Sequence, residues 1–368
     1  RHHREIEPTQ APTTLTATFA LVAGLASADD VRVYNWSDYI DEETLPSFEK
    51  ETGTSVVYDV FDSNEVLEAK LLSGQSGFDL VVPTNDFLGK QIKAGAFMPL
   101  DRAALPNWSN LDPHMMKLLE DVDPGNQYAV PYMWGTTGIG INVEKVEQAL
   151  GDDAPLNSWS LVFEKEYLEK LQSCGVVALD APTEVLSSAL NYLGLDPNST
   201  DKGDLEKATD LMLSVRPYYR YFHSSKYVND LANGDICAVI GWSGDVAQAA
   251  ARAEEADNGV SVQYIIPKEG ALMWFDQMAI PADAANSKEA HMFLNYIMRP
   301  EVIAKASNYV YYANGNKASQ PLLEEDLIGD PGVYPTPEAT KALYAKLAYD
   351  PKTQRLATRL WTKVTTGQ

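Results

Sequence analysis

Residues 31–82 have the sequence VRVYNWSDYIDEETLPSFEKETGTSVVYDVFDSNEVLEAKLLSGQSGFDLVV, in which short β-rich runs alternate with segments whose apolar residues recur at helical spacing. With the twelve residues that follow, this stretch predicts three strands and three helices: strands at 31–34, 55–61 and 78–82, and helices at 42–51, 64–72 and 87–94. Strands and helices that alternate in this way predict a parallel sheet covered by helices, which is an α/β fold.

A second α/β region follows without a long linker. A predicted strand at 128–132 leads into this region. The region itself is predicted to contain mixed helix and strand at 167–195, strands at 236–241, 260–266 and 278–280, and a helix at 287–298. Between them the glycine-rich run GTTGIGI at 135–141 predicts a bend, with a turn or hinge as its role. Two such regions predict two lobes with a ligand site between them. The boundaries that we predict are 30–136 plus 261–312 for the N-terminal lobe and 137–260 plus 313–368 for the C-terminal lobe.

The chain is strongly acidic. It has 29 Lys and Arg residues against 52 Asp and Glu residues, a formal net charge of -23. This balance argues against nucleic acid as a partner, because phosphates require basic patches. It is compatible with a cationic ligand, whose local concentration a negative field raises, and also with a charge that serves solubility alone.

The first 28 residues differ from the rest in composition. An apolar, uncharged run at 14–25 (TLTATFALVAGL) precedes the small residues 26–28 (ASA), a pattern typical of a secretory signal. We therefore expect 1–28 to be a signal or leader segment and the protein to be exported. The sequence has two cysteines, Cys174 and Cys237. In an exported protein an even count permits one disulfide, and two unrelated buried thiols remain the alternative.

Several enzyme motifs are absent from the sequence. The glycines at 135–140 are followed by no Gly-Lys-Ser/Thr and do not match a dinucleotide fingerprint, and there is no Gly-x-Ser-x-Gly nucleophile elbow. The histidines after the leader, His114, His223 and His291, are not at metal-ligand spacing. The remaining enzymatic alternative is a hydrolase that uses paired carboxylates as acid and base.

Aromatic residues and carboxylates recur together after predicted strands. Four segments share this pairing: 35–39 (NWSDY), 83–87 (PTNDF), 242–245 (WSGD) and 273–276 (MWFD). In an open α/β sheet the carboxyl ends of strands border the ligand crevice. Aromatic rings there can hold an alkylammonium by cation–π contact, and a carboxylate can fix each ammonium by a charge-assisted hydrogen bond.

At these residues the chain resembles the periplasmic polyamine-binding proteins of bacterial ABC transporters, especially the putrescine-binding type. The resemblance spans roughly Val31 to the C-terminus. The segments that carry it are 33–40 (VYNWSDYI), 57–68 (VYDVFDSNEVLE), 132–140 (YMWGTTGIG), 221–225 (YFHSS), 231–237 (LANGDIC) and 266–270 (IPKEG). The resemblance implies a two-lobed fold with crossing hinge strands, a role in binding and not in catalysis, and a disulfide between Cys174 and Cys237.

The resemblance also implies the residues of the ligand site. They are Trp36, Ser37, Asp38, Tyr39, Thr84, Asp86, Phe87, Glu184, Trp242, Asp245, Trp274, Asp276 and Tyr312. In the family, residues of the Asp245 and Asp276 type hold one ammonium, the Asp38 and Glu184 side serves the other, and the rings flank the methylenes. We accordingly expect a periplasmic monomer that takes a small polyamine, delivers it to the membrane permease of an ABC transporter, and uses no cofactor or metal.

The sequence departs from the family pattern at positions that bear on the ligand. Asp38, Ala181 and Asp245 match the putrescine-binding type. Trp274 stands where putrescine binders commonly have Phe and spermidine binders have Trp, and Asp86 replaces the usual Ser or Tyr. We therefore expect putrescine first, with spermidine, cadaverine or agmatine as alternatives. A sensor that presents its occupied form to a signalling receptor is a further alternative, since transport and sensing use the same closed form.

Overall fold

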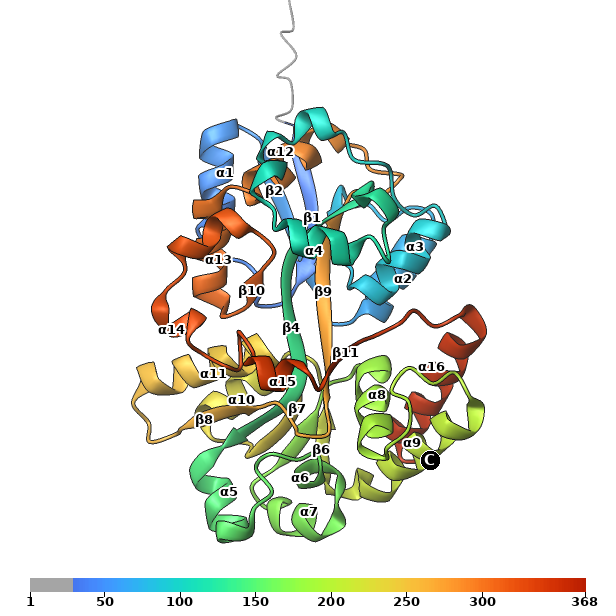
Figure 1. Ribbon diagram of the computed structural model, residues 1–368, viewed down its shortest axis with the longest axis vertical. Helices are drawn as coiled ribbons and strands as arrows, with labels where there is room; N and C mark the ends of the chain where they lie inside the picture. The colour runs from blue at the N-terminus through green and yellow to red at the C-terminus, as the bar shows by residue number, and fades with distance from the viewer. Residues whose placement is uncertain (1–28) are drawn as a thin grey trace, which may run out of the picture.

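The structure is a computed structural model that describes residues 29–368 (Figure 1). The predicted leader at 1–28 lies outside the described residues. Within the described part, no helix has both the length and the apolar character that a membrane span requires. The elements gather into an upper and a lower lobe, with two long strands running between them (Figure 1).

The upper lobe contains the three strands and three helices that the opening stretch predicts. Its elements are β1 (Asp30–Trp36), α1 (Thr44–Thr52), β2 (Ser55–Phe61), α2 (Asn64–Leu72), β3 (Leu80–Val81), α3 (Asn85–Lys93), α4 (Pro113–Leu119), α12 (Ser287–Ile297), α13 (Pro300–Val310) and β10 (Ala313–Asn314). The parallel sheet is confirmed here, because β1 pairs in parallel with both β2 and β3. Alternate residues of β1, such as Val31 and Val33, are fully buried, as a sheet face covered by helices requires.

The lower lobe repeats the arrangement with different chain segments. Its elements are α5 (Val143–Leu150), α6 (Ser160–Phe163), α7 (Lys165–Leu171), β5 (Val176–Ala178), α8 (Pro182–Tyr192), α9 (Lys202–Val215), β6 (Tyr219–Phe222), α10 (Tyr227–Asn233), β7 (Ala238–Trp242), α11 (Ser243–Ala256), β8 (Val262–Ile265) and α16 (Pro351–Thr366). Strand β5 pairs in parallel with β6 and with β7. The two lobes are therefore both α/β units.

Two long strands connect the lobes. β4 (Ala129–Asn142) and β9 (Ala271–Ala279) pair with each other in antiparallel fashion and stand at the centre of the strand order β2-β1-β3-β9-β4-β7-β5-β6. The chain then returns through α14 (Glu325–Ile328), α15 (Pro337–Thr340) and β11 (Leu343–Ala345), the last of which adds to β9 in parallel. The lobes thus share one continuous sheet.

The glycine-rich run corrects one prediction. Residues 135–141 form no bend but continue strand β4. A Cβ at Gly135 would lie 2.6 Å from the Ser243 Oγ and 2.9 Å from the Trp274 ring, and a Cβ at Gly138 would lie 2.6 Å from the Tyr264 hydroxyl. The glycines are required for close approach to β4 and not for a turn, which a local sequence pattern cannot distinguish.

The lobe boundaries stay a prediction, and two short strands pair across them. β8, which the prediction assigned to the N-terminal lobe, pairs with residues 139–142 of β4 in the lower lobe. β10, assigned to the C-terminal lobe, pairs with Met133 and Trp134 of β4 in the upper lobe. In both cases the exchange occurs at a strand that crosses between the lobes.

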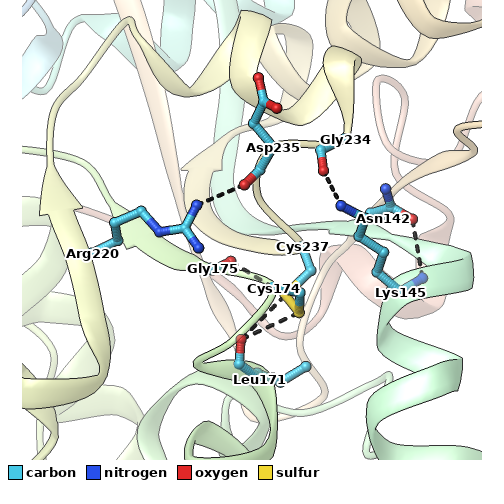
Figure 2. Close-up of a disulfide and its surroundings, with 9 residues drawn as sticks. All are labelled: Asn142, Lys145, Leu171, Cys174, Gly175, Arg220, Gly234, Asp235 and Cys237. Atoms are coloured by element: carbon cyan, nitrogen blue, oxygen red, sulfur yellow. Dashed lines mark hydrogen bonds between the residues drawn. A yellow bond between two sulfur atoms is a disulfide. The ribbon is translucent and has the colours of Figure 1, made fainter.

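The disulfide that the resemblance implied is present. Cys174 and Cys237 are joined, with their Cα atoms 5.5 Å apart. Figure 2 shows the bridge beside Leu171, at the end of α7, and beside Gly175, whose carbonyl accepts a hydrogen bond from the Cys237 amide at 2.9 Å. The two cysteines are 63 residues apart in the sequence, and closing a loop of this length stabilises the fold by about 4 kcal/mol through the lost entropy of the unfolded chain.

Candidate functional site

A cavity lies at the junction of the two lobes, beside the crossing strands. It has a volume of about 310 Å³, open solvent included. Ten of the thirteen site residues predicted from the sequence line it: Trp36, Ser37, Tyr39, Thr84, Glu184, Trp242, Asp245, Trp274, Asp276 and Tyr312. These residues come from both lobes and from β9.

Strand ends and helix starts place most of the lining residues. Trp36 is the last residue of β1, and Trp242 is the last residue of β7. Thr84 precedes α3, and Glu184 and Asp245 lie in the first turns of α8 and α11. This is the edge of the sheet at which an open α/β fold binds its ligand.

The fourth aromatic–carboxylate pair differs from the prediction. Trp274 and Asp276 lie inside β9 and not at a strand end. Both nevertheless line the cavity, since they are two residues apart in an extended strand and so project from the same face. The crossing of β9 between the lobes brings this face to the cavity.

Asp276 is held by two hydroxyl groups. Thr84 Oγ1 donates a hydrogen bond to its Oδ1 at 2.7 Å, and the Tyr39 hydroxyl donates to its Oδ2 at 2.8 Å. Burial raises the pKa of Asp276 to about 7, although both hydrogen bonds act in the opposite direction. The two donors fix the orientation of a carboxyl group that burial has deprived of water.

Asp245 is held in the same way by two phenols. The Tyr312 hydroxyl donates to Oδ1 at 2.7 Å, and the Tyr227 hydroxyl donates to Oδ2 at 3.0 Å. The Tyr227 oxygen also accepts a hydrogen bond from the Trp242 amide at 3.1 Å. Burial raises the pKa of Asp245 to about 7.

Glu184 carries the third carboxyl group of the cavity and is partly buried. Its Oε2 accepts hydrogen bonds from the Trp242 indole Nε1 at 2.6 Å and from Thr137 Oγ1 at 2.7 Å. Burial raises its pKa to about 7, and the nearby Asp86 adds to the increase. Trp242 therefore has two roles, as a ring on the cavity wall and as the donor that orients Glu184.

The aromatic rings of the cavity contact one another. The ring centroids of Trp36 and Trp242 are 5.4 Å apart in an edge-to-face arrangement. Tyr312 packs with Tyr39 at 5.0 Å and with Trp274 at 5.7 Å. Rings in mutual contact have fixed orientations, so they present ready-made faces to an alkylammonium chain.

Three predicted site residues do not line the cavity. Asp38 has a positive φ of 55° and a half-exposed side chain, which lies 3.5 Å from the guanidinium of Arg252. Asp86 and Phe87 are buried in α3, and the Lys90 ammonium lies 3.9 Å from the centre of the Phe87 ring. Because successive residues of a helix point in different directions, the cavity contact of Thr84 does not extend to Asp86 and Phe87, which lie in the first turn of α3. The role of these three residues in ligand binding stays a prediction.

Two residues that hold the buried carboxyl groups were missed by sequence reasoning. Tyr227 begins α10 and reaches Asp245, and Thr137 lies in β4 and reaches Glu184. Neither belongs to an aromatic–carboxylate pair, and Thr137 lies in the run for which we expected a bend. No local pattern marks them, because their contacts connect residues 18 and 47 positions apart.

The charge of the cavity is one-sided. Its lining has three carboxyl groups, two of them buried and that of Glu184 partly buried, and none of the ten lining residues is Lys, Arg or His. Among residues 29–368 there is no group of three His, Cys, Asp or Glu side chains arranged to hold a metal ion. What this arrangement can do chemically is hold an organic cation whose charged ends meet carboxylates and whose apolar part meets rings.

Comparison with known proteins places the chain in a family. The model of the bacterial extracellular solute-binding proteins matches residues 43–335. The chain belongs to this family. Its fold is accordingly that of a two-lobed solute-binding protein. A solved structure described as a putative spermidine/putrescine ABC transporter from Listeria monocytogenes superposes with a TM-score of 0.82 at 31% identity, covering 92% of this chain and 100% of that chain.

Relatives of this solute-binding protein include named polyamine binders. It is 56% identical to the putrescine-binding periplasmic protein PotF of Escherichia coli, over 96% of each chain. It is 55% identical to the putrescine-binding periplasmic protein SpuD of Pseudomonas aeruginosa, over 97% of this chain and 98% of that one. The resemblance to polyamine-binding proteins inferred from the sequence motifs is confirmed by these identities.

Proposed function

We propose that this solute-binding protein captures putrescine in the periplasm and delivers it to the permease of an ABC transporter. It acts by binding, and no chemical step is assigned to its carboxyl groups. Two relatives that are more than half identical to it are named as putrescine-binding periplasmic proteins, which supports the ligand and the compartment. A sensor role would use the same site, and no feature of the cavity favours it.

The observation that carries this function is the charge of the cavity. Asp245 and Asp276 are buried, Glu184 beside them is partly buried, and no lining side chain supplies a positive charge. Buried carboxylates without a counter-charge are unstable, and burial holds their pKa values near 7. A diamine supplies the missing positive charges, so binding and ionisation of the carboxyl groups favour each other.

The geometry suggests how the diamine lies. The tyrosines that hold Asp245 and Asp276, Tyr312 and Tyr39, pack edge to face with ring centroids 5.0 Å apart, which supports placing the two carboxyl groups at one end of the cavity. We assign one ammonium to this pair. We assign the second to Glu184, since Asp38 is paired with Arg252 outside the cavity. The tryptophan rings then flank the methylenes, and the lobes close on the ligand about β4 and β9.

Alternative ligands within this function are spermidine, cadaverine and agmatine. Relatives at 33–34% identity are named as spermidine/putrescine-binding proteins, and one at 48% is named as a putrescine/agmatine-binding protein. The two relatives that are more than half identical to the chain are named as putrescine-binding proteins, which favours putrescine among these ligands. Of the two departures noted in the sequence, Trp274 lines the cavity and Asp86 does not.

Isothermal titration calorimetry with putrescine tests the proposal. We expect a single site with micromolar or tighter affinity. Asp276→Asn should weaken binding about a hundredfold or more, because it removes the charge that one buried ammonium requires. Asp123→Asn is the matched control: this carboxyl group is also buried, but it accepts hydrogen bonds from the amides of Gln127, Tyr128 and Ala129, away from the cavity.

The control separates loss of the site from loss of the fold. Asp123→Asn should lower the melting temperature and leave the dissociation constant for putrescine close to that of the unaltered chain. If protein that has been unfolded and refolded without ligand takes up no putrescine, spermidine, cadaverine or agmatine, the proposed function is wrong.

A further inference from the structure

The Trp274 side chain lines the cavity, but its indole N–H is bonded to a neighbouring strand. Its Nε1 donates a hydrogen bond to Thr137 Oγ1 at 3.2 Å. Trp274 lies in β9 and Thr137 in β4, and both side chains are buried, that of Thr137 completely. An indole has one N–H to donate, so Trp274 offers the cavity its ring and gives its hydrogen bond to the protein.

The backbone of β4 leaves room for this indole. Gly135 is the residue of β4 that pairs with Trp274 of β9. A Cβ at Gly135 would lie 2.9 Å from the Trp274 ring, a separation that a real side chain does not tolerate. Any other residue at this position would push the ring away from the strand and from Thr137, so the glycine is part of the arrangement.

Thr137 connects the indole to a carboxyl group of the cavity. Its hydroxyl donates a hydrogen bond to Glu184 Oε2 at 2.7 Å. A hydroxyl has one hydrogen to donate and two lone pairs that accept, so it can receive the indole N–H and donate to the carboxylate at the same time. The indole occupies the accepting side of the Thr137 oxygen and thereby directs its hydrogen toward Glu184. Trp274, Thr137 and Glu184 thus form a chain of two hydrogen bonds that run in the same direction.

Glu184 receives both of its side-chain donors at one oxygen. The Trp242 indole Nε1 lies 2.6 Å from Oε2, the atom to which Thr137 also donates. Within the part of the chain that the structure describes, this leaves Oε1 as the oxygen that can accept from an ammonium. Two tryptophans therefore set the orientation of Glu184, Trp242 directly and Trp274 through Thr137.

We propose that Trp274 is a positioning residue for the second ammonium of the diamine: through Thr137 it fixes the orientation of Glu184, the carboxyl group to which this ammonium is assigned. This inference rests on the proposed function and deepens it by naming what holds one charged end of the ligand site in place. Trp274 then has two roles, as a ring beside the methylenes and as the origin of the hydrogen bonds that reach Glu184. The second role requires the Thr137 hydroxyl and the first does not, so the two can be measured separately.

A double-mutant cycle on putrescine binding, measured by calorimetry, tests the proposal. Trp274→Phe keeps an aromatic ring and removes the indole N–H, and Thr137→Val keeps the branched shape and removes the hydroxyl. Each single variant should weaken binding about tenfold, because Glu184 loses a donor or the group that directs this donor. In the Thr137→Val background, Trp274→Phe should weaken binding by only about threefold or less, because the connection to Glu184 is already broken.

The pH dependence of the affinity gives a second measurement. The Thr137 hydrogen bond lowers the pKa of Glu184, against the larger effect of burial. Thr137→Val and, to a smaller extent, Trp274→Phe should therefore move upward the pH below which putrescine affinity declines. A tryptophan that acted only through its ring would change the affinity by the same factor at every pH.

Trp159→Phe is the matched control. Trp159 is also completely buried, and its indole Nε1 donates to the Gly270 carbonyl at 2.8 Å, but it does not line the cavity. This substitution should lower the melting temperature and leave the dissociation constant for putrescine unchanged.

The outcomes separate this inference from the proposed function. If the unaltered chain binds no polyamine, the proposed function itself fails. If it binds putrescine but the effects of Trp274→Phe and Thr137→Val multiply independently, or if Trp274→Phe changes the affinity equally at every pH, only the role of Trp274 is overturned. Should Thr137→Val fail to fold, as judged by circular dichroism, the pH profile of Trp274→Phe decides alone.

Discussion

At the scale of single residues, the site depends on hydroxyl and indole groups that hold carboxylates. Each of the three cavity carboxyl groups accepts two hydrogen bonds from side chains. Such donors stabilise the ionised form and oppose the effect of burial. The carboxyl groups are therefore poised to ionise when a cationic ligand arrives, and their orientation is fixed beforehand.

Tyr227 provides a test of this role, because its hydroxyl touches Asp245 but the residue is not part of the cavity lining. Tyr227→Phe should weaken putrescine binding about tenfold, as expected for one hydrogen bond to a charged group. The loss of a donor should also raise the pKa of Asp245, so the pH below which affinity declines should move upward. Titrations at several pH values measure both effects. A uniform loss of affinity at every pH would mean that Tyr227 only fills space.

At the scale of secondary-structure elements, the crossing strand β4 decides how closely the lobes pack. Ser243, at the start of α11, and Trp274, in β9, approach the strand where Gly135 has no side chain, and Tyr264 of β8 does so at Gly138. The glycines weaken the strand in isolation, since they lose more conformational entropy on folding than other residues. The packing that they permit offsets this cost.

Gly138→Ala should therefore destabilise the fold by about 1–3 kcal/mol, because the added methyl group meets Tyr264 and the neighbouring backbone. Gly89→Ala is the matched control. It lies inside α3, and its Cβ would be 3.5 Å from Val122, an ordinary van der Waals contact, so alanine there should be neutral or stabilising. Urea unfolding of both variants measures the free energies. Equal stability of the two would show that β4 tolerates side chains at Gly138.

At the scale of the whole molecule, the charge of the cavity belongs to a strongly acidic protein. The formal net charge of -23 attracts cations toward the chain, and the two lobes bring three carboxyl groups together at one cavity. Folding therefore raises the pKa values of Glu184, Asp245 and Asp276 to about 7. The ligand-free protein binds more protons at these groups than the unfolded chain does.

This linkage fixes the sign of the pH dependence. Because the folded pKa values are raised, these groups lower the stability of the ligand-free protein as pH rises from about 4 to about 7. Binding of a diamine should strengthen over the same range and release protons, since the carboxyl groups must ionise. Melting curves with and without putrescine should therefore separate further at pH 8 than at pH 5, by about several degrees. A thermal shift that is independent of pH would contradict the raised pKa values.

The sequence by itself determined the α/β alternation, the family and ten of the cavity residues. The spacing of apolar residues is a local property, so the pattern at 31–34 and at 55–61 predicts a strand without reference to the rest of the chain. The aromatic–carboxylate pairs that follow β1 and β7 likewise need only the rule that strand ends border the ligand site.

Only the tertiary structure decided which of the remaining side chains converge. It extended the glycine run into β4, kept Asp38, Asp86 and Phe87 out of the cavity lining, and brought Tyr227 to Asp245. It also paired β11 with β9, which joins segments about 70 residues apart. The physical reason is common to these cases: each depends on contacts between distant parts of the chain, and short-range spacing carries no record of them.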